Sequence, residues 1–81
     1  MRQYWAALWH SNNKLDGLRE HLICENCIPK LFTSRQKARE YIWKEYGYIR
    51  NREDLRKEPH GWRVPRAVRV EVLYFKKINL V

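Results

Sequence analysis

The stretch TSRQKAREYIWKEYG, residues 33–47, decides the fold because it carries the clearest secondary-structure signal in the chain. Thr33 and Gln36 match a capping box, in which the threonine side chain accepts a hydrogen bond from the Gln36 amide and the glutamine reaches back. Apolar side chains recur at helical spacing, and Gly47 stands where a C-terminal cap is expected. The resulting stripe consists of Ala38, Tyr41, Ile42, Tyr46 and Ile49. We therefore predict an amphipathic helix that begins after Thr33 and ends at Gly47.

Three short strands are predicted before this helix. Residues 3–10 are rich in aromatic side chains and lack Pro and Gly, which is typical of a strand. Asp16 and Gly17 form a strong hairpin dipeptide because both tolerate positive φ, so a second strand is expected at about residues 18–24. Pro29 then begins a short third strand, which reaches Phe32, at a position where its missing backbone donor is harmless.

A polar segment and one further strand are predicted after the helix. Residues 48–65 are interpreted as a long loop, with one short helix capped by Asn51 and ending before Pro59. In residues 66–74, RAVRVEVLY, apolar and charged side chains alternate at period two, which is typical of a strand. The order strand, strand, strand, helix, loop, strand predicts one α+β domain over residues 1–81, with a single main helix packed on a small antiparallel sheet.

Length and composition exclude several classes of protein. The chain has 81 residues with four Trp, five Tyr and two Phe, which is enough apolar area to fold but too little chain for separate catalytic and cofactor domains. The first residues do not form a credible signal peptide, and no stretch is apolar enough to cross a bilayer. Two cysteines without a secretion signal indicate a reducing compartment. We expect a cytoplasmic, non-enzymatic protein without cofactor or membrane contact.

Positive charge dominates the second part of the chain. The net charge is +8, and residues 1–33 carry four basic and three acidic side chains, whereas residues 34–81 carry thirteen and six. Arginine forks suit phosphate, and an exposed Trp or Tyr can stack on an unpaired base. We predict contact with nucleic acid, DNA or RNA, without strong sequence readout; the plain alternative is a solvated surface partly neutralised by nearby carboxylates. The candidate residues are Arg35, Lys37, Arg39, Arg50, Arg52, Arg56, Trp62, Arg63, Arg66 and Arg69.

The same charge supports a second hypothesis, an inhibitor that covers an acidic or nucleic-acid-binding surface of a host complex such as RNA polymerase or a CRISPR effector. The positions of the aromatic side chains separate the two hypotheses. An exposed patch of Trp43, Leu73 and Phe75 favours a protein partner or a homodimer, whereas an exposed Trp62 among arginines favours nucleic acid. Arg39 and Trp43, four residues apart, can instead form a cation–π pair.

Two further groups of residues have side chains capable of chemistry. His21, Cys24 and Cys27 are of types that zinc accepts, but only one cysteine pair exists, and the favoured interpretation is a core Cys24 and a partly exposed Cys27 without metal. His60 has no serine, cysteine or paired carboxylate placed to assist it, so the favoured interpretation is that Gly61 makes a tight turn and Trp62 packs over the helix. We predict no catalytic residue.

Two segments resemble small uncharacterised proteins encoded by bacteriophages and prophages. They are LFTSRQKAREYI at residues 31–42, and YGYIR at 46–50 together with PHGWRVP at 59–65, and the resemblance spans roughly residues 30–72. It implies a phage or prophage origin and no assigned activity. The strands that lead into a helix through Phe-Thr also resemble the three-stranded DNA-binding modules of phage integrases and plant AP2 factors, which read DNA with the sheet face. Those sheets are strongly basic, whereas residues 1–33 here are nearly neutral, so we expect contact through the helix and the following loop.

Overall fold

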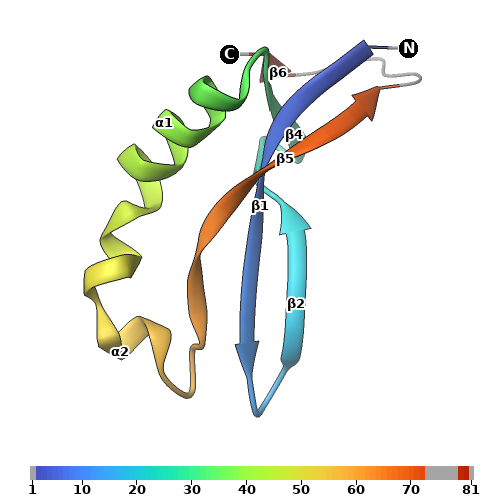
Figure 1. The fold of residues 1–81 in the computed structure, drawn as a ribbon. Helices are drawn as coiled ribbons and strands as arrows, with labels where there is room; N and C mark the ends of the chain where they lie inside the picture. Colours follow the sequence, from blue (N-terminus) through green and yellow to red (C-terminus); the bar gives the residue numbers. More distant parts are fainter. Residues whose placement is uncertain (1, 73–78, 81) are drawn as a thin grey trace.

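The computed structural model describes residues 2–72 and 79–80, and it is an α+β fold, as predicted (Figure 1). One main helix packs on a small, strongly twisted sheet. In chain order the elements are β1 (Arg2–Asn13), β2 (Gly17–Leu22), β3 (Cys24–Glu25), β4 (Ile28–Phe32), α1 (Arg35–Tyr46), the 3₁₀ helix η1 (Gly47–Asn51), α2 (Glu53–Arg56), β5 (Trp62–Val72) and β6 (Asn79–Leu80).

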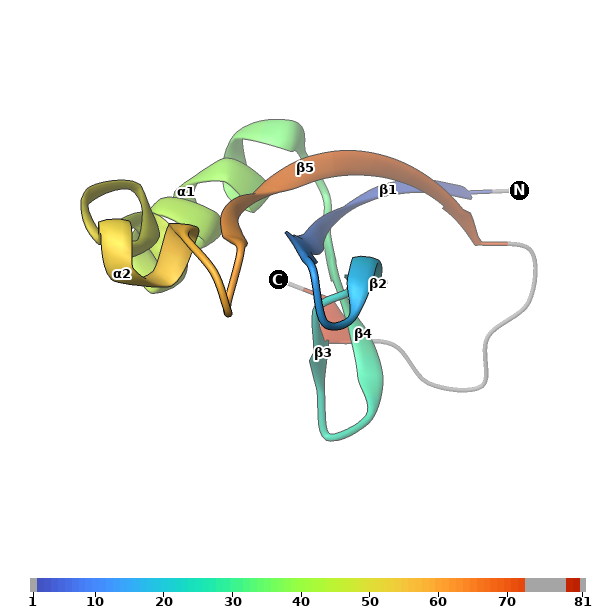
Figure 2. The ribbon, with the colours of Figure 1, turned by 90° about the horizontal axis from the view of Figure 1, so that it is seen from below.

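β1 is the central strand of the sheet. β5 pairs antiparallel with β1 along one edge for almost the whole length of both strands. On the other edge, β1 pairs antiparallel with β2 at residues 8–13 and with β4 at residues 5–6. β4 pairs in turn with β3, antiparallel, and with β6, parallel. The helices therefore gather beside β5, while β2, β3 and β4 lie on the other side of β1 (Figure 2).

Both faces of β1 are buried, because its successive side chains enter two different clusters. Tyr4 and Ala6 pack with Leu31 on one face, and Ala7 packs with Ile23 and Ile42 on the other. Ala6 and Ala7 have no exposed surface, since β4 and α1 approach the strand closely at these small side chains. This arrangement explains why the first strand shows apolar residues on both faces in the sequence.

α1 turns the predicted stripe inward, but its first turn is capped differently from the prediction. Ala38 and Ile42 are buried against the sheet, and Tyr41 is half-buried. The N-cap is Ser34, whose Oγ accepts a hydrogen bond from the backbone amide of Lys37 at 3.2 Å. The capping box at Thr33 is therefore wrong. The helix starts one residue later because Ser34 has the extended backbone and the hydroxyl that an N-cap needs.

The predicted end of α1 is confirmed, since the helix ends at Tyr46 and Gly47 is its C-cap residue. Gly47 has right-handed helical dihedrals, with φ −59° and ψ −26°, rather than those of a left-handed cap. The chain instead tightens into η1 and carries Ile49, the last residue of the stripe, into a fully buried position. The prediction that Asn51 caps the next helix is wrong, because Asn51 ends η1 and Arg52 occupies the cap position of α2.

The predicted tight turn at Gly61 is confirmed, and it brings β5 back beside β1. Gly61 has φ +64°, its amide donates to the Lys57 carbonyl at 2.9 Å, and its own carbonyl accepts from the Asn12 amide at 2.9 Å. β1 consequently continues to Asn13 and β5 already begins at Trp62, so both strands are longer than predicted.

Candidate nucleic-acid interface

A groove between α1 and β5 gathers part of the predicted basic set. Its helix side presents Arg35, Arg39 and Trp43, which stand four residues apart in one row beside the buried stripe. Its strand side is formed by residues 64–67 of β5, which include Arg66. We call this set, the three helix residues and residues 64–67, the arginine groove. Its volume is about 360 Å³, and Arg35, Arg39 and Trp43 also line a wider hollow of about 750 Å³ along α1.

Trp5 lies next to the arginine groove, where it contacts Arg35 at the start of α1. The guanidinium carbons of Arg35 and Arg69 lie 5.9 Å and 5.4 Å from the centre of the Trp5 ring. Arg69 reaches this ring because it stands directly opposite Trp5 in the β1–β5 pairing, on the face that α1 covers. Two like charges thus converge on one half-buried indole. An anion placed between them would reduce their repulsion, since the Coulomb energy of each cation with the anion is favourable.

The arginines of this region form no ion pair within the described residues. The four ion pairs found there use Asp16, Glu25, Glu53 and Asp54 instead. Glu40 borders the wider hollow, but its carboxylate accepts a hydrogen bond from Gln36 at 3.1 Å. Arg35 and Arg39 are exposed to solvent, so their guanidinium donors are accessible to a bound phosphate.

A second basic cluster, around α2 and the start of β5, is used to hold the protein itself together. Arg52 makes a two-pronged contact with Asp54, at 2.9 and 2.7 Å, and this hydrogen bonding lowers the pKa of the Asp54 carboxyl and raises that of the guanidinium. Arg56 donates to the carbonyl of Arg50 at 3.2 Å, and Arg63 donates to the Arg56 carbonyl at 2.9 Å. These predicted site residues therefore fasten η1, α2 and β5 to one another.

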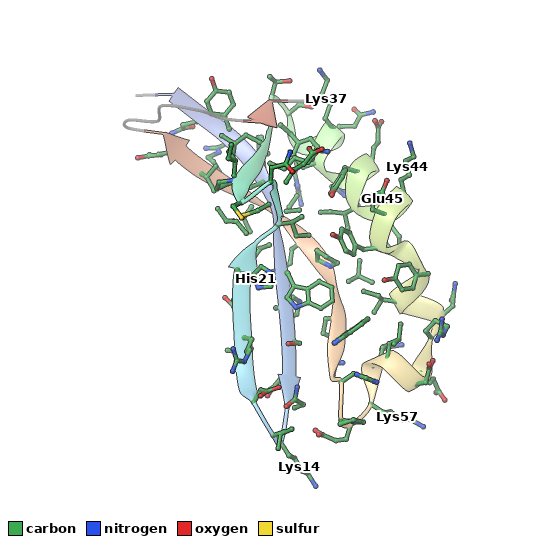
Figure 3. All side chains as sticks on the ribbon, turned by 180° about the vertical axis from the view of Figure 1, so that it is seen from behind. Lys14, His21, Lys37, Lys44, Glu45 and Lys57 are labelled. Atoms are coloured by element: carbon green, nitrogen blue, oxygen red, sulfur yellow. The ribbon has the colours of Figure 1, made fainter. Side chains whose placement is uncertain are left out.

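Lys37, another predicted site residue, lies apart from the arginine groove. It lines a hollow on the other flank of α1 with Lys30, Lys44 and the carboxylates of Glu40 and Glu45. Figure 3 shows Lys37 and Lys44 along α1, with Lys14 and Lys57 at the opposite end of the molecule. The predicted set is therefore divided among the arginine groove, the α2 cluster and the flank of Lys37, while Arg69 lies over Trp5 and Trp62 packs on Trp9.

The exposed aromatic side chain of the groove is Trp43 rather than Trp62. Trp62 is half-buried, and its ring packs edge-to-face on Trp9 at 5.3 Å between ring centres, so it packs on β1 and not over the helix. Trp43 is 47% exposed and lies in the groove with Arg35 and Arg39. The cation within 6 Å of its ring is Arg50, at 5.8 Å, rather than the predicted Arg39. The aromatic criterion for nucleic acid, an exposed Trp62, is therefore not met. Of the patch that would favour a protein partner, Trp43 is exposed, and Leu73 and Phe75 lie outside the described residues.

The cysteines and histidines form no site in the described part of the chain. Both Cys24 and Cys27 are exposed, so the predicted core position of Cys24 is wrong. Cys24 lies in a two-residue strand at the rim of the sheet, and its Sγ contacts the Leu22 carbonyl at 3.4 Å. Within residues 2–72 and 79–80 no three His, Cys, Asp or Glu side chains stand close enough to hold a metal ion. His60 uses its backbone carbonyl to accept from Asn13 at 3.0 Å and contacts Trp62 with its ring.

Comparison with known protein families, with curated proteins and with solved structures gives no match. Among the residues described, no helix has the length and apolar character needed to span a membrane.

Proposed function

We propose that the protein binds nucleic acid, without catalysing a reaction, by holding the phosphate backbone in the arginine groove. The observation that carries this proposal is that Arg35 and Arg69 converge on Trp5, while Arg35 and Arg39 line the groove with Trp43. None of these arginines forms an ion pair with a carboxylate in the described residues. Arginines that serve only solubility have no reason to gather in one groove. Arginines that contact successive phosphates do, because each contact releases condensed counterions and aligns the strand.

The arginines around α2 differ from those of the arginine groove. Arg52, Arg56 and Arg63 each donate to carboxylate or carbonyl oxygens of the same chain, so part of their hydrogen-bonding capacity serves the fold. We therefore assign the principal contact to the arginine groove and Arg69, and only an accessory electrostatic role to the α2 cluster. Contacts to phosphate position a strand without reading its sequence, so we expect DNA or RNA to bind without strong sequence preference.

The test is fluorescence anisotropy of labelled DNA and RNA with three proteins. The wild type is compared with a groove variant, Arg35→Gln, Arg39→Gln and Arg69→Gln, and with a control variant, Lys14→Gln, Lys37→Gln and Lys57→Gln. Both variants lose three positive charges, and none of these six side chains is buried. Circular dichroism and thermal unfolding establish that both variants keep the fold.

We expect the groove variant to bind about 10- to 1,000-fold more weakly than the wild type, because three phosphate contacts of about 0.5–1.5 kcal/mol each are lost. The control variant should bind within a few-fold of the wild type, apart from its general loss of charge. Equal losses in the two variants would contradict a groove-centred site. Failure of the wild type to bind any nucleic acid at moderate salt would refute the proposal and favour a protein partner.

A further inference from the structure

We infer that the arginine groove takes single-stranded rather than duplex nucleic acid, and that Trp43 stacks on an unpaired base of the bound strand. This inference rests on the proposed function and names the substrate class of the same site. The observation behind it is that the indole of Trp43 is 47% exposed and lies in a groove lined by arginines, whereas the adjacent Ile42 is buried against the sheet. Aromatic side chains in a basic groove are the common means of holding single strands, since every base offers a π-face.

The indole of Trp43 lies against the backbone of Gly47. A Cβ built on Gly47 would stand 3.0 Å from Cε3 of Trp43, so the ring lies directly against the glycine backbone. Gly47 has right-handed helical dihedrals that any residue adopts, and alanine would favour the helical backbone there. A Cβ at residue 47 would therefore press on the ring and shift it by a few tenths of an ångström. The guanidinium of Arg50, 5.8 Å from the ring centre, adds a second neighbour.

A platform held in this way suits stacking on a base. An ordered ring loses little conformational freedom when a base packs on it, so more of the stacking energy appears as affinity. The nearby indole of Trp5 does not offer a comparable face, because it is half-buried and approached by two guanidinium groups. Trp43 is thus the stacking residue, and Arg35 and Arg69 at Trp5 mark the path of the phosphates.

The spacing of the row fits a short single strand. Arg35, Arg39 and Trp43 span eight residues of helix, about 12 Å at 1.5 Å per residue, which is the rise of three to four stacked nucleotides. In a duplex the base faces are covered by neighbouring pairs, so Trp43 can reach them only after the pairs open. The arginines alone would attract either form; the exposed indole adds a contact that only unpaired bases complete.

The experiment compares a labelled oligothymidine of about ten nucleotides with a blunt duplex of the same length, by anisotropy at one moderate salt concentration. The variants are Trp43→Ala, Trp43→Phe and Gly47→Ala. Tyr48→Ala is the matched control, because Tyr48 is another exposed aromatic residue, 49% exposed, that lies outside the groove lining. Circular dichroism and thermal unfolding of each variant report whether the fold is kept.

We expect Trp43→Ala to weaken single-strand binding about 5- to 150-fold and to leave duplex binding unchanged. Trp43→Phe should retain most of the affinity because a smaller ring still stacks. Gly47→Ala keeps Trp43 but displaces its ring, so it should weaken single-strand binding in the same direction. Tyr48→Ala should bind as the wild type.

Two outcomes overturn the inference while leaving the proposed function in place. One is a wild type that binds duplex as tightly as single strand through the groove arginines. The other is a Trp43→Ala variant that binds oligothymidine like the wild type or like Tyr48→Ala. A wild type that binds neither form refutes the proposed function together with the inference.

Discussion

Replacing Gly61 with alanine should destabilise the protein far more than the same change at Gly17, although both glycines have positive φ. Gly17 has φ +71° with nothing within 4 Å of an added Cβ, so Gly17→Ala costs only the left-handed backbone strain of about 1–2 kcal/mol. At Gly61 the same Cβ would collide with the carbonyl of Asn12. Relief requires β1 and β5 to separate locally, which breaks the 2.9 Å hydrogen bond between the Asn12 amide and the Gly61 carbonyl.

The difference between these two variants isolates the close approach of the strands. Overpacking costs about 1–3 kcal/mol and a lost backbone hydrogen bond about 1 kcal/mol, so Gly61→Ala should lose about 2–4 kcal/mol more than Gly17→Ala. For a domain of this size that difference corresponds to a further fall of the melting temperature by roughly 8 °C or more. Thermal unfolding followed by circular dichroism, with urea unfolding as a second measure, gives both values. Equal melting temperatures for the two variants would refute the close approach at Gly61.

Three further predictions concern a cap, an ion pair and the thiols. Ser34→Ala should cost about 1 kcal/mol of unfolding free energy because the N-cap of α1 is lost, whereas Thr33→Ala should change it by less than about 0.5 kcal/mol; urea unfolding that shows the reverse order would restore the capping box at Thr33. The hydrogen bond from Arg52 lowers the pKa of Asp54, so this pair stabilises the fold above the ordinary aspartate pKa and loses its effect as the pH falls through the lowered value. In an NMR titration Asp54 should therefore have a midpoint below that of ordinary aspartates, and Arg52→Gln should return it toward the usual value; an unchanged midpoint contradicts the contact. Both cysteines are exposed, so a thiol reagent such as Ellman's should modify two thiols per folded chain, and a need for denaturant to reach the second would contradict their positions.

The elements with a regular pattern could be predicted from the sequence. The alternating valines of β5, the hairpin dipeptide ending at Gly17 and the helical stripe of α1 each follow from one local rule of periodicity or turn geometry. The capping residue of α1 could not be fixed in the same way, because Thr33 and Ser34 are adjacent and both can cap. Only the backbone dihedrals, extended at Ser34, decide between them.

Only the basic composition of the site could be predicted from the sequence. The sequence indicates a basic second half, but whether an arginine serves a ligand or the fold depends on contacts between distant residues. Arg69 reaches Trp5 across the β1–β5 pairing, and Arg63 reaches the Arg56 carbonyl across the turn at Gly61. Such partners are set by the register of the strands and cannot be read from spacing.

The aromatic residues illustrate the same limit of local patterns. Trp62 lies among arginines in the sequence, yet the turn at Gly61 brings it against Trp9. Trp43 shows the opposite behaviour, because the row that it forms with Arg35 and Arg39 at four-residue spacing is visible in the sequence. The ring of Trp43 against Gly47 could not be predicted in this way, because it follows from the dihedrals and packing of the folded chain.

The central claim, that the arginine groove holds a phosphate backbone, is tested most directly by the salt dependence of binding. The measurement is the slope of log affinity against log salt concentration for a labelled single strand, with the wild type and with the variant Arg35→Gln, Arg39→Gln and Arg69→Gln. Each phosphate contact contributes about 0.7 to the slope for a single strand, so three lost contacts should reduce its magnitude by about 2. A slope that is the same in both proteins would contradict the claim and move the site elsewhere on the molecule.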